Sequence, residues 1–266
     1  MNIYSPRLSV VIIAKNAEKI ITRCLQSVVP IADEMIVVIN DCTDETKIFA
    51  ESYGAKVVEH RWEGFRDQKN FAIDIATYEW VLSLDADEAI NEVLMTSIKN
   101  FISTTNNPYV AAKFARKTFF LNKWISYGDW YPDYSLRLFK KGHGRFVGGR
   151  VHERIEVDGK VRRIKGDILH YSGELPEEFI NRNALYADLA ARDLFEYKKK
   201  ISPLGAAIKA QWTFFHSYIL KLGFLDGSIG YFIARLKSFF TLYKYIRLLN
   251  FYEEAPLPEN PNKSQS

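Results

Sequence analysis

The sequence lacks the features that mark several common protein classes. Its two cysteines, Cys24 and Cys42, form no CxxC pair, so neither a disulfide framework nor a structural zinc site is expected. Charged residues interrupt every apolar stretch before it reaches the ~18 residues that a membrane-spanning helix needs. The N-terminus has no basic segment followed by a long apolar run and a small-residue cleavage site, so we expect the chain to stay on the side of the membrane where it is made.

Several nucleotide-binding and nucleic-acid-binding patterns are also missing. No G-x-G-x-x-G segment follows the first apolar run, which disfavours a dinucleotide-dependent oxidoreductase. No RNP, helix-turn-helix or zinc pattern is present, and nucleic acid is therefore not an expected partner. There is no internal repeat. With 47% hydrophobic residues among 266, the chain can bury a sizeable core in one large domain with an appendage.

Apolar runs and helical patterns alternate along the first 84 residues. Buried strands are predicted at residues 8–14, 35–39 and 80–84, because each is a short, mainly apolar run bounded by polar residues. Residues 56–59 are predicted to form a further short strand. Helices are predicted at residues 17–29, 46–53 and 65–76. This alternation predicts a parallel, right-handed α/β sheet. Short aromatic-rich strand candidates follow at residues 109–115, 135–139 and 164–171, and predict a mixed part of the same domain, which spans residues 1–175.

Residues 176–252 form a second predicted region, which is helical, aromatic and basic. Between residues 198 and 247 there are nine lysines and arginines against one acid, Asp226. Aromatic rings and cations together suit helices that lie in the head-group zone of an anionic membrane. The alternative is a helical subdomain with a solvated basic face. Residues 253–266, with three prolines, are predicted to be a flexible tail.

Two carboxylates follow the fourth predicted strand, in the sequence Asp85-Ala86-Asp87. Ligands of open parallel sheets bind beyond the carboxyl ends of the strands. Residues i and i+2 project to one side, so both carboxylates can hold one divalent cation that also binds a diphosphate. Such a cation neutralises the charge that develops on a departing nucleoside diphosphate. The alternative is that Asp87 caps a helix starting near Ala89 while Asp85 only ends the strand.

A resemblance to a known family rests on six segments, which occur in the order LSVVIIAKNAE, IVVINDCTDET, FRDQKNFAIDIA, WVLSLDADE, GDWYPDYSLRLFKKG and RVHERIEVDG, the last followed by KGDILHYS. Together they resemble the family 2 glycosyltransferases, and most of all the bacterial lipopolysaccharide-core β-glucosyltransferase subgroup. The resemblance extends over residues 8–250. It implies a GT-A (Rossmann-like) fold, with a mixed, mostly parallel sheet and flanking helices, plus the C-terminal basic and aromatic helical region.

The same resemblance implies an activity, a cofactor and a location. It implies metal-dependent transfer of a hexose, here glucose, with inversion at the anomeric carbon. The implied donor is a UDP-sugar, and the implied acceptor is a lipid-linked saccharide such as the lipopolysaccharide inner core. Mg²⁺ or Mn²⁺ is the implied cofactor. The implied location is cytoplasmic, peripheral on the inner face of the cytoplasmic membrane, with anionic lipids as a partner. Two alternatives remain open: a glycosyltransferase that acts on polyprenyl phosphate, and a non-catalytic membrane-binding scaffold.

The resemblance also assigns residues to the nucleotide sugar. The end of the first strand, Ala14-Lys15-Asn16, corresponds to residues near the base, and Asn40 or Asp41 to the contact with uracil or ribose. The second strand ends one residue earlier than in relatives, so the choice between Asn40 and Asp41 stays open, as does a simple Asx turn. The further candidates for this ligand are Lys69 for a phosphate, Asp85 and Ala86, and Arg137 as a diphosphate clamp whose planar fork suits phosphate oxygens.

An inverting transfer needs a base for the acceptor hydroxyl. Glu153 is the first candidate and Asp133 the second; the alternative for Glu153 is an ion pair with Arg150 or Arg154. His170 is a candidate third metal ligand beside Asp85 and Asp87, or else a structural histidine. Finally, Trp130 and Tyr131 are candidates for acceptor binding by stacking on sugar rings, with ordinary core packing as the alternative.

Overall fold

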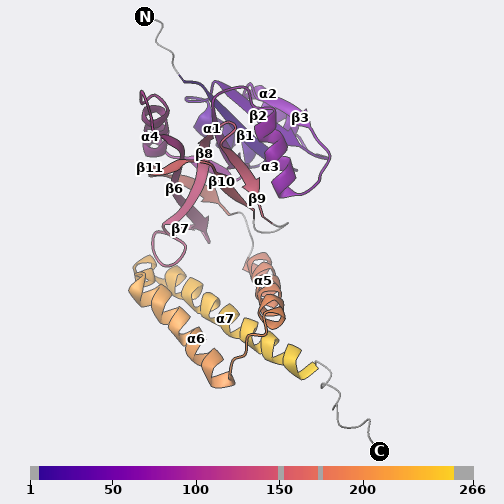
Figure 1. Cartoon of the computed structure of the whole chain (residues 1–266), viewed down its shortest axis with the longest axis vertical. Helices are drawn as coiled ribbons and strands as arrows, with labels where there is room; N and C mark the ends of the chain where they lie inside the picture. The colour runs from indigo at the N-terminus through magenta and orange to yellow at the C-terminus, as the bar shows by residue number, and fades with distance from the viewer. Residues whose placement is uncertain (1–5, 149–152, 173–175, 255–266) are drawn as a thin grey trace, which may run out of the picture. The chain divides into compact units, whose positions relative to one another are not determined.

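The computed structural model describes residues 6–148, 153–172 and 176–254 (Figure 1). The chain divides into two compact units. The first comprises residues 1–124 and 130–172 and contains the sheet, and the second comprises residues 125–129 and 173–266 and contains the long C-terminal helices. The division falls three residues before the predicted start of the helical region, and the loop at residues 125–129 joins the second unit.

The first half of the sheet is parallel, with strand order β3-β2-β1-β4. The strands and the helices that connect them have the following bounds: β1 Leu8–Ala14, α1 Ile21–Val28, β2 Glu34–Ile39, α2 Thr46–Ser52, β3 Lys56–Glu59, α3 Phe65–Asp74 and β4 Trp80–Asp85. Each predicted strand is present within one residue of its expected limits. Their carboxyl ends therefore meet at one edge of the sheet.

The second half of the sheet is mixed, in the order β4-β8-β6-β11-β5. Strand β8 is antiparallel to both β4 and β6, β11 is parallel to β6, and the short β5 is antiparallel to β11. The bounds are β5 Glu88–Ile90, α4 Glu92–Ile102, β6 Tyr109–Phe120, β7 Lys123–Trp124, β8 Asp133–Lys140 and β11 Lys160–Tyr171, with a separate hairpin of β9 Gly144–Val147 and β10 Arg154–Val157. The predicted mixed, mostly parallel sheet with flanking helices is confirmed.

Both faces of the sheet are covered by helices, which explains why the first strands are apolar without alternation. Leu8, Val10 and Ile12 of β1 share one buried cluster with residues of α1 and α4. Val11 of β1 lies in the other cluster, together with Ala72 of α3. Alternate residues of one strand thus enter cores on opposite faces, and the sheet edge between these layers is held rigidly.

The structure decides against one alternative for Asp87. The helix that follows the acidic segment begins later than Ala89, and its N-cap is Asn91, whose side chain accepts a hydrogen bond from the Leu94 N–H at 2.8 Å. Ala89 lies instead in β5, which pairs with β11 and places His170 opposite Glu88. Helix capping therefore does not account for Asp87.

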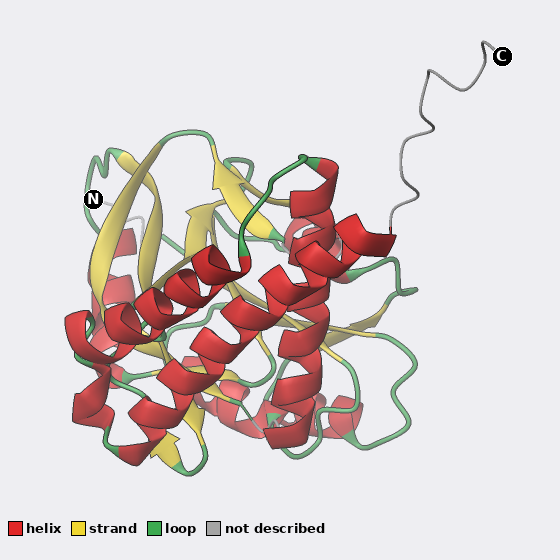
Figure 2. Cartoon of the chain, turned by 90° about the horizontal axis from the view of Figure 1, so that it is seen from below, coloured by secondary structure: helices red, strands yellow, loops and turns green. Residues whose placement is uncertain are grey.

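The second unit consists of helices joined by tight turns (Figure 2). Helices α5 and α6 both pack on α7; the bounds are α5 Pro176–Glu196, α6 Pro203–Phe215, a π-helical turn His216–Leu220, a 3-10 turn Gly223–Asp226 and α7 Ser228–Glu254. Gly230 lies so close to the Gly223 carbonyl that a side chain there would force the backbone apart. Asp226 accepts hydrogen bonds from the N–H groups of Ser126 (3.0 Å) and Tyr127 (2.9 Å), which ties the 125–129 loop to this unit.

Membrane crossing finds no support in the part of the chain that the structure describes: none of its helices combines the length and the apolar character that a bilayer span requires.

Candidate functional site

The candidate site lies at the carboxyl edge of the parallel strands, where Asp85 is the last residue of β4. The Asp85 carboxylate bridges two cations from other elements. Its Oδ1 lies 2.8 Å from Lys69 Nζ of α3, and its Oδ2 accepts a hydrogen bond from Arg137 Nη2 of β8 at 2.9 Å. Lys69 Nζ also donates to Glu153 Oε1 at 3.1 Å. One lysine thus links the strand-end aspartate to the first candidate for the base.

Neighbouring charges decide the ionisation of this cluster. Burial by itself would raise the pKa of Asp85, but the positive charges of Arg137 and Lys69 outweigh burial and hold that pKa well below its usual range. Burial would likewise lower the pKa of Arg137, and the carboxylates of Glu88 and Asp85 raise it instead. Both groups are therefore charged at neutral pH and hold each other in place.

Glu88 is a member of this cluster that the sequence reasoning missed. Its side chain is fully buried and accepts hydrogen bonds from Arg137 Nη2 (3.1 Å) and from the Asp85 N–H (3.0 Å). Arg116 Nη1 lies 3.7 Å away. Burial is the main cause of the raised pKa of Glu88. The signal that could have revealed it is a third acid directly after Asp85-Ala86-Asp87, at the start of a segment otherwise apolar.

Asp87 and His170 form a second pair in the site. Asp87 Oδ2 lies 3.2 Å from His170 Nε2, and the two side chains are 35% and 21% exposed. His170 Nδ1 lies 3.4 Å from Thr118 Oγ1, and the Asp87 carbonyl accepts a hydrogen bond from the Tyr171 N–H at 2.9 Å. The pair is thus reachable from solvent on a fixed backbone.

At 3.2 Å, Asp87 Oδ2 and His170 Nε2 are at direct ion-pair distance from each other. Two neighbouring ligands of an octahedral ion at about 2.1 Å lie roughly 3.0 Å apart, close to the distance observed here. Among the described residues, no group of three or more His, Cys, Asp and Glu side chains is arranged to hold a metal. Both oxygens of Asp85 are occupied by Lys69 and Arg137, so a role of Asp85 as a third ligand stays a prediction.

The residues predicted to meet the nucleotide lie at the ends of β1 and β2. Ala14 is buried, whereas Lys15 and Asn16 are exposed in the loop that follows it. Asn16 Oδ1 accepts a hydrogen bond from the Thr43 N–H at 2.9 Å, which fastens this loop to the one after β2. In that second loop Asn40 is buried and Asp41 is exposed with a φ of 42°. The structure thus brings the two predicted segments together at the same sheet edge as Asp85.

The acceptor-side candidates fall in different surroundings. Asp133 is 47% exposed and pairs with Arg116 at 3.1 Å. Trp130 packs edge-on against Phe120. The Tyr131 hydroxyl donates to Asp167 Oδ1 at 2.9 Å; burial and then Asp167 raise the pKa of Tyr131 to about 12.

The predicted alternative for Glu153 can be examined in part. Arg154 pairs with Glu156 at 2.5 Å rather than with Glu153, and Arg150 lies outside the described residues. Glu153 instead meets Lys69, and its side chain is only 17% exposed. Among the described residues, the ion pair that Glu153 forms therefore connects it through Lys69 to Asp85 and not to Arg154.

Comparison with known proteins identifies the family. A family model described as Glycosyl transferase family 2 matches residues 9–157, which is more than half of the chain. The chain belongs to glycosyltransferase family 2. The matched segment of this glycosyltransferase contains Lys69, Asp85, Asp87 and Glu153 but ends before His170.

Individual relatives agree with this assignment along most of their length. An uncharacterized glycosyltransferase of Rickettsia bellii is 31% identical over 267 residues, covering 96% of this chain and 89% of the relative. The lipopolysaccharide core biosynthesis glycosyltransferase LpsC of Rhizobium meliloti is 24% identical over 273 residues, covering 96% and 95%. Among solved structures, S. aureus TarS 1-349 matches with a TM-score of 0.47 and 15% identity, covering 93% and 91% of the two chains.

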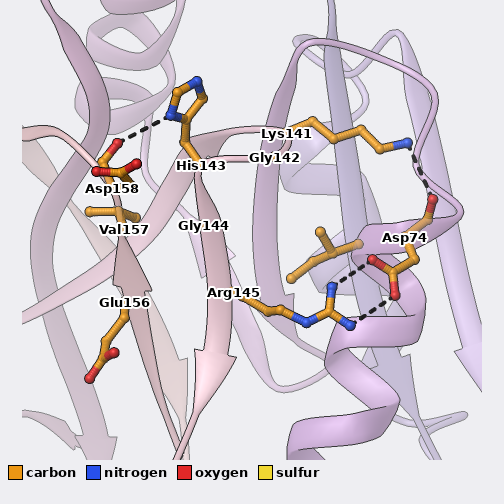
Figure 3. Close-up of a pocket in the computed structure, with 10 residues that line it drawn as sticks. Asp74, Lys141, Gly142, His143, Gly144, Arg145, Glu156, Val157 and Asp158 are labelled. Carbon is orange, nitrogen blue, oxygen red and sulfur yellow. Dashed lines mark hydrogen bonds and ion pairs between the residues drawn. The ribbon is translucent and has the colours of Figure 1, made fainter.

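A hollow of about 630 Å³ lies at the end of β4 opposite to the candidate site (Figure 3). The Lys141 N–H on its rim donates to the carbonyl of Glu79, the residue before β4. Two of its cations are paired within it: Arg145 meets both oxygens of Asp74 at 2.8 and 3.1 Å, and Lys141 donates to the carbonyls of Asp74 and Ala76 at the end of α3. None of the predicted site residues lines this hollow. The candidate site is therefore the cluster at the carboxyl edge.

Proposed function

We propose that this family 2 glycosyltransferase transfers glucose, with inversion, from UDP-glucose to a lipid-linked saccharide such as the lipopolysaccharide inner core. The observation that carries the proposal is one cluster at the sheet edge. In it, the ion-paired side chains of Glu153, Lys69 and Asp85 lie beside the Asp87–His170 pair. The cluster offers a base for the acceptor hydroxyl and a pair of side chains for a cation that stabilises the leaving diphosphate, two parts that hydroxyl attack on a nucleotide sugar uses.

Asp87 and His170 are the residues that we assign to the divalent cation, Mg²⁺ or Mn²⁺. When bound, such an ion supplies a Lewis acid that stabilises the negative charge of the leaving diphosphate. Thr118 stands near the opposite ring nitrogen of His170 and orients the ring. The loops after β1 and β2, which the hydrogen bond between Asn16 and Thr43 joins, are assigned to the nucleoside, because they lie at the same edge of the sheet.

Glu153 is assigned as the base. Lys69 holds Glu153 Oε1 at 3.1 Å, which leaves the other carboxylate oxygen to accept a proton. That oxygen takes the proton from the acceptor hydroxyl while the hydroxyl oxygen bonds to the anomeric carbon and the bond to the diphosphate oxygen breaks on the opposite face. Because Lys69 also holds Asp85 at 2.8 Å, the base is fixed relative to the strand end.

The similarity supports the proposed acceptor, and the helices of the second unit support the proposed location. LpsC is named for lipopolysaccharide core biosynthesis, and we extend that acceptor class to this chain. Trp130 and Tyr131 are assigned to the saccharide. Helix α6 exposes Leu204 (71%), Ile208 (60%), Trp212 (58%) and Phe215 (44%), whose spacing places them on one side of the helix. With the exposed Lys209 beside them, this face suits peripheral attachment to the cytoplasmic side of an anionic membrane.

The test is the rate of UDP release from UDP-glucose, with Mn²⁺ and an inner-core glycolipid acceptor, for wild type, Glu153→Gln and Glu156→Gln. Glu156 is the matched control, because it is an exposed glutamate of the same segment that pairs with Arg154. We expect Glu153→Gln to lose about 10²- to 10⁴-fold in kcat and Glu156→Gln to match wild type. An unchanged rate for Glu153→Gln contradicts the base assignment and favours an acceptor that is already an anion, such as polyprenyl phosphate. Absence of UDP release with every hexose donor and acceptor, together with absence of UDP binding, would favour the scaffold.

A further inference from the structure

Arg23 has no part in the mechanism above, although it lies next to the site. It is an exposed residue of α1, and its guanidinium carbon lies 3.9 Å from the centre of the Tyr171 ring. A guanidinium stacked on an aromatic ring keeps its N–H donors at its edge, where they can bind an anion in its plane. Stacking therefore orients this cation without using its hydrogen bonds.

Tyr171 is itself held at the turn that carries Asp87. Its N–H donates to the Asp87 carbonyl at 2.9 Å, and its ring packs against Trp124 and Phe119. Arg23, Tyr171 and Asp87 are neighbours around one narrow gap that has no room for a water molecule. The stack thus places a cation beside the side chain that we assign to the divalent ion.

The other cations of the cluster are already committed to carboxylates. Lys69 binds Asp85 and Glu153, and Arg137 binds Asp85 and Glu88; both are buried. For Arg23, in contrast, no carboxylate of the described residues lies at ion-pair distance. Within the described parts of the chain, neither its charge nor its donors are committed to a carboxylate at the end of the site where Asp87 and His170 meet.

We propose that Arg23 binds the diphosphate of the nucleotide-sugar donor. This assignment rests on the proposed function, since it takes the diphosphate to lie at the Asp87–His170 pair. Arginine matches two phosphate oxygens with parallel N–H donors, and such charge-assisted hydrogen bonds are about twice as strong as neutral ones. The negative charge on the diphosphate increases as the glycosidic bond breaks, so the same contact also stabilises the leaving group.

The experiment is titration calorimetry of UDP in the presence of Mn²⁺ with the full chain. Arg23→Gln should weaken UDP binding by about 10- to 100-fold. Tyr171→Phe should bind as wild type does because the ring is retained, whereas Tyr171→Ala should lose affinity with Arg23→Gln. Arg7→Gln is the matched control: Arg7 also stacks on a tyrosine, Tyr78, at 5.1 Å, but it precedes β1 at the opposite edge of the sheet. Thermal unfolding of each variant separates loss of affinity from loss of fold.

The outcomes separate this assignment from the proposed function. A wild-type protein that binds no UDP overturns the proposed function and the role of Arg23 with it. Binding by wild type that is unchanged in Arg23→Gln overturns the role of Arg23 alone. If the UDP affinity of Arg23→Gln is unchanged while its KM for a phosphorylated acceptor rises, Arg23 serves an acceptor phosphate, and the assignment to the donor is wrong.

Discussion

Glu88 offers a demanding prediction, because its role rests on the structure alone. Replacing Glu88 with alanine removes the acceptor of two hydrogen bonds, from Arg137 at 3.1 Å and from the Asp85 N–H at 3.0 Å. Of the described carboxylates, only Asp85 would then remain at ion-pair distance from the buried Arg137. Removing one partner of a buried ion pair costs about 3–5 kcal/mol, and we expect Glu88→Ala to reduce the free energy of unfolding by that amount.

The assay is urea unfolding of the full chain followed by circular dichroism. Glu88→Gln should be destabilised less, by about 2 kcal/mol, since the amide keeps one acceptor oxygen but turns its NH₂ group toward a donor. Glu79→Ala is the control: Glu79 is 40% exposed and pairs with Lys140 at 2.9 Å, and a surface pair contributes about 0–1 kcal/mol. If Glu88→Ala and Glu79→Ala unfold at the same urea concentration, the buried pair does not stabilise the site as we argue.

Two further predictions concern ionisation and the membrane. Asp85→Asn should lower the free energy of unfolding by about 2 kcal/mol at pH 7. Because the folded state depresses the pKa of Asp85, the carboxylate stabilises the fold above its unfolded pKa of about 3.9, and this contribution is lost as the pH falls from there through the folded pKa. The difference in stability between wild type and variant should therefore shrink in unfolding curves measured below about pH 4. Trp212→Ser should reduce co-sedimentation with vesicles that contain anionic lipid several-fold, whereas serine at Trp62, an exposed tryptophan of the sheet unit, should leave it unchanged; equal sedimentation of both variants would refute attachment through α6.

The sequence predicted the parallel half of the sheet well, and for a local reason. Strands β1 to β4 are apolar, β-branched runs that end at polar residues, so their limits are written in adjacent residues. The short β5 is different. Its three residues have no strand signal of their own, and they form a strand because β11 offers a free edge to pair with. Antiparallel β8, between β4 and β6, likewise depends on contacts far along the chain.

Most residues of the cluster were predicted from the sequence, but Glu88 was missed and the pairing was not predicted. Asp85, Asp87, Lys69, Glu153 and Arg137 were all predicted site residues, and the structure places all except Asp87 in one connected set of ion pairs. The pairing itself could not be predicted, because Lys69 and Glu153 are 84 residues apart. Local sequence suggested an arginine partner for Glu153, whereas the nearby Arg154 pairs with Glu156. Pairs of this kind depend on which elements the fold brings together, here α3 and the segment before β10.

The proposed glycosyl transfer requires Asp87 and His170 to hold a divalent ion against the donor diphosphate. The most direct measurement is the affinity for UDP with and without Mn²⁺, for wild type, Asp87→Asn and Asp74→Asn. Asp74 is an exposed aspartate that pairs with Arg145 away from the site, and it serves as the control. We predict that Mn²⁺ increases UDP affinity at least about tenfold in wild type and in Asp74→Asn. This increase should be absent in Asp87→Asn, because disrupting the surroundings of a metal site typically costs 10–100-fold in metal affinity. An equal increase in Asp87→Asn would contradict the assignment.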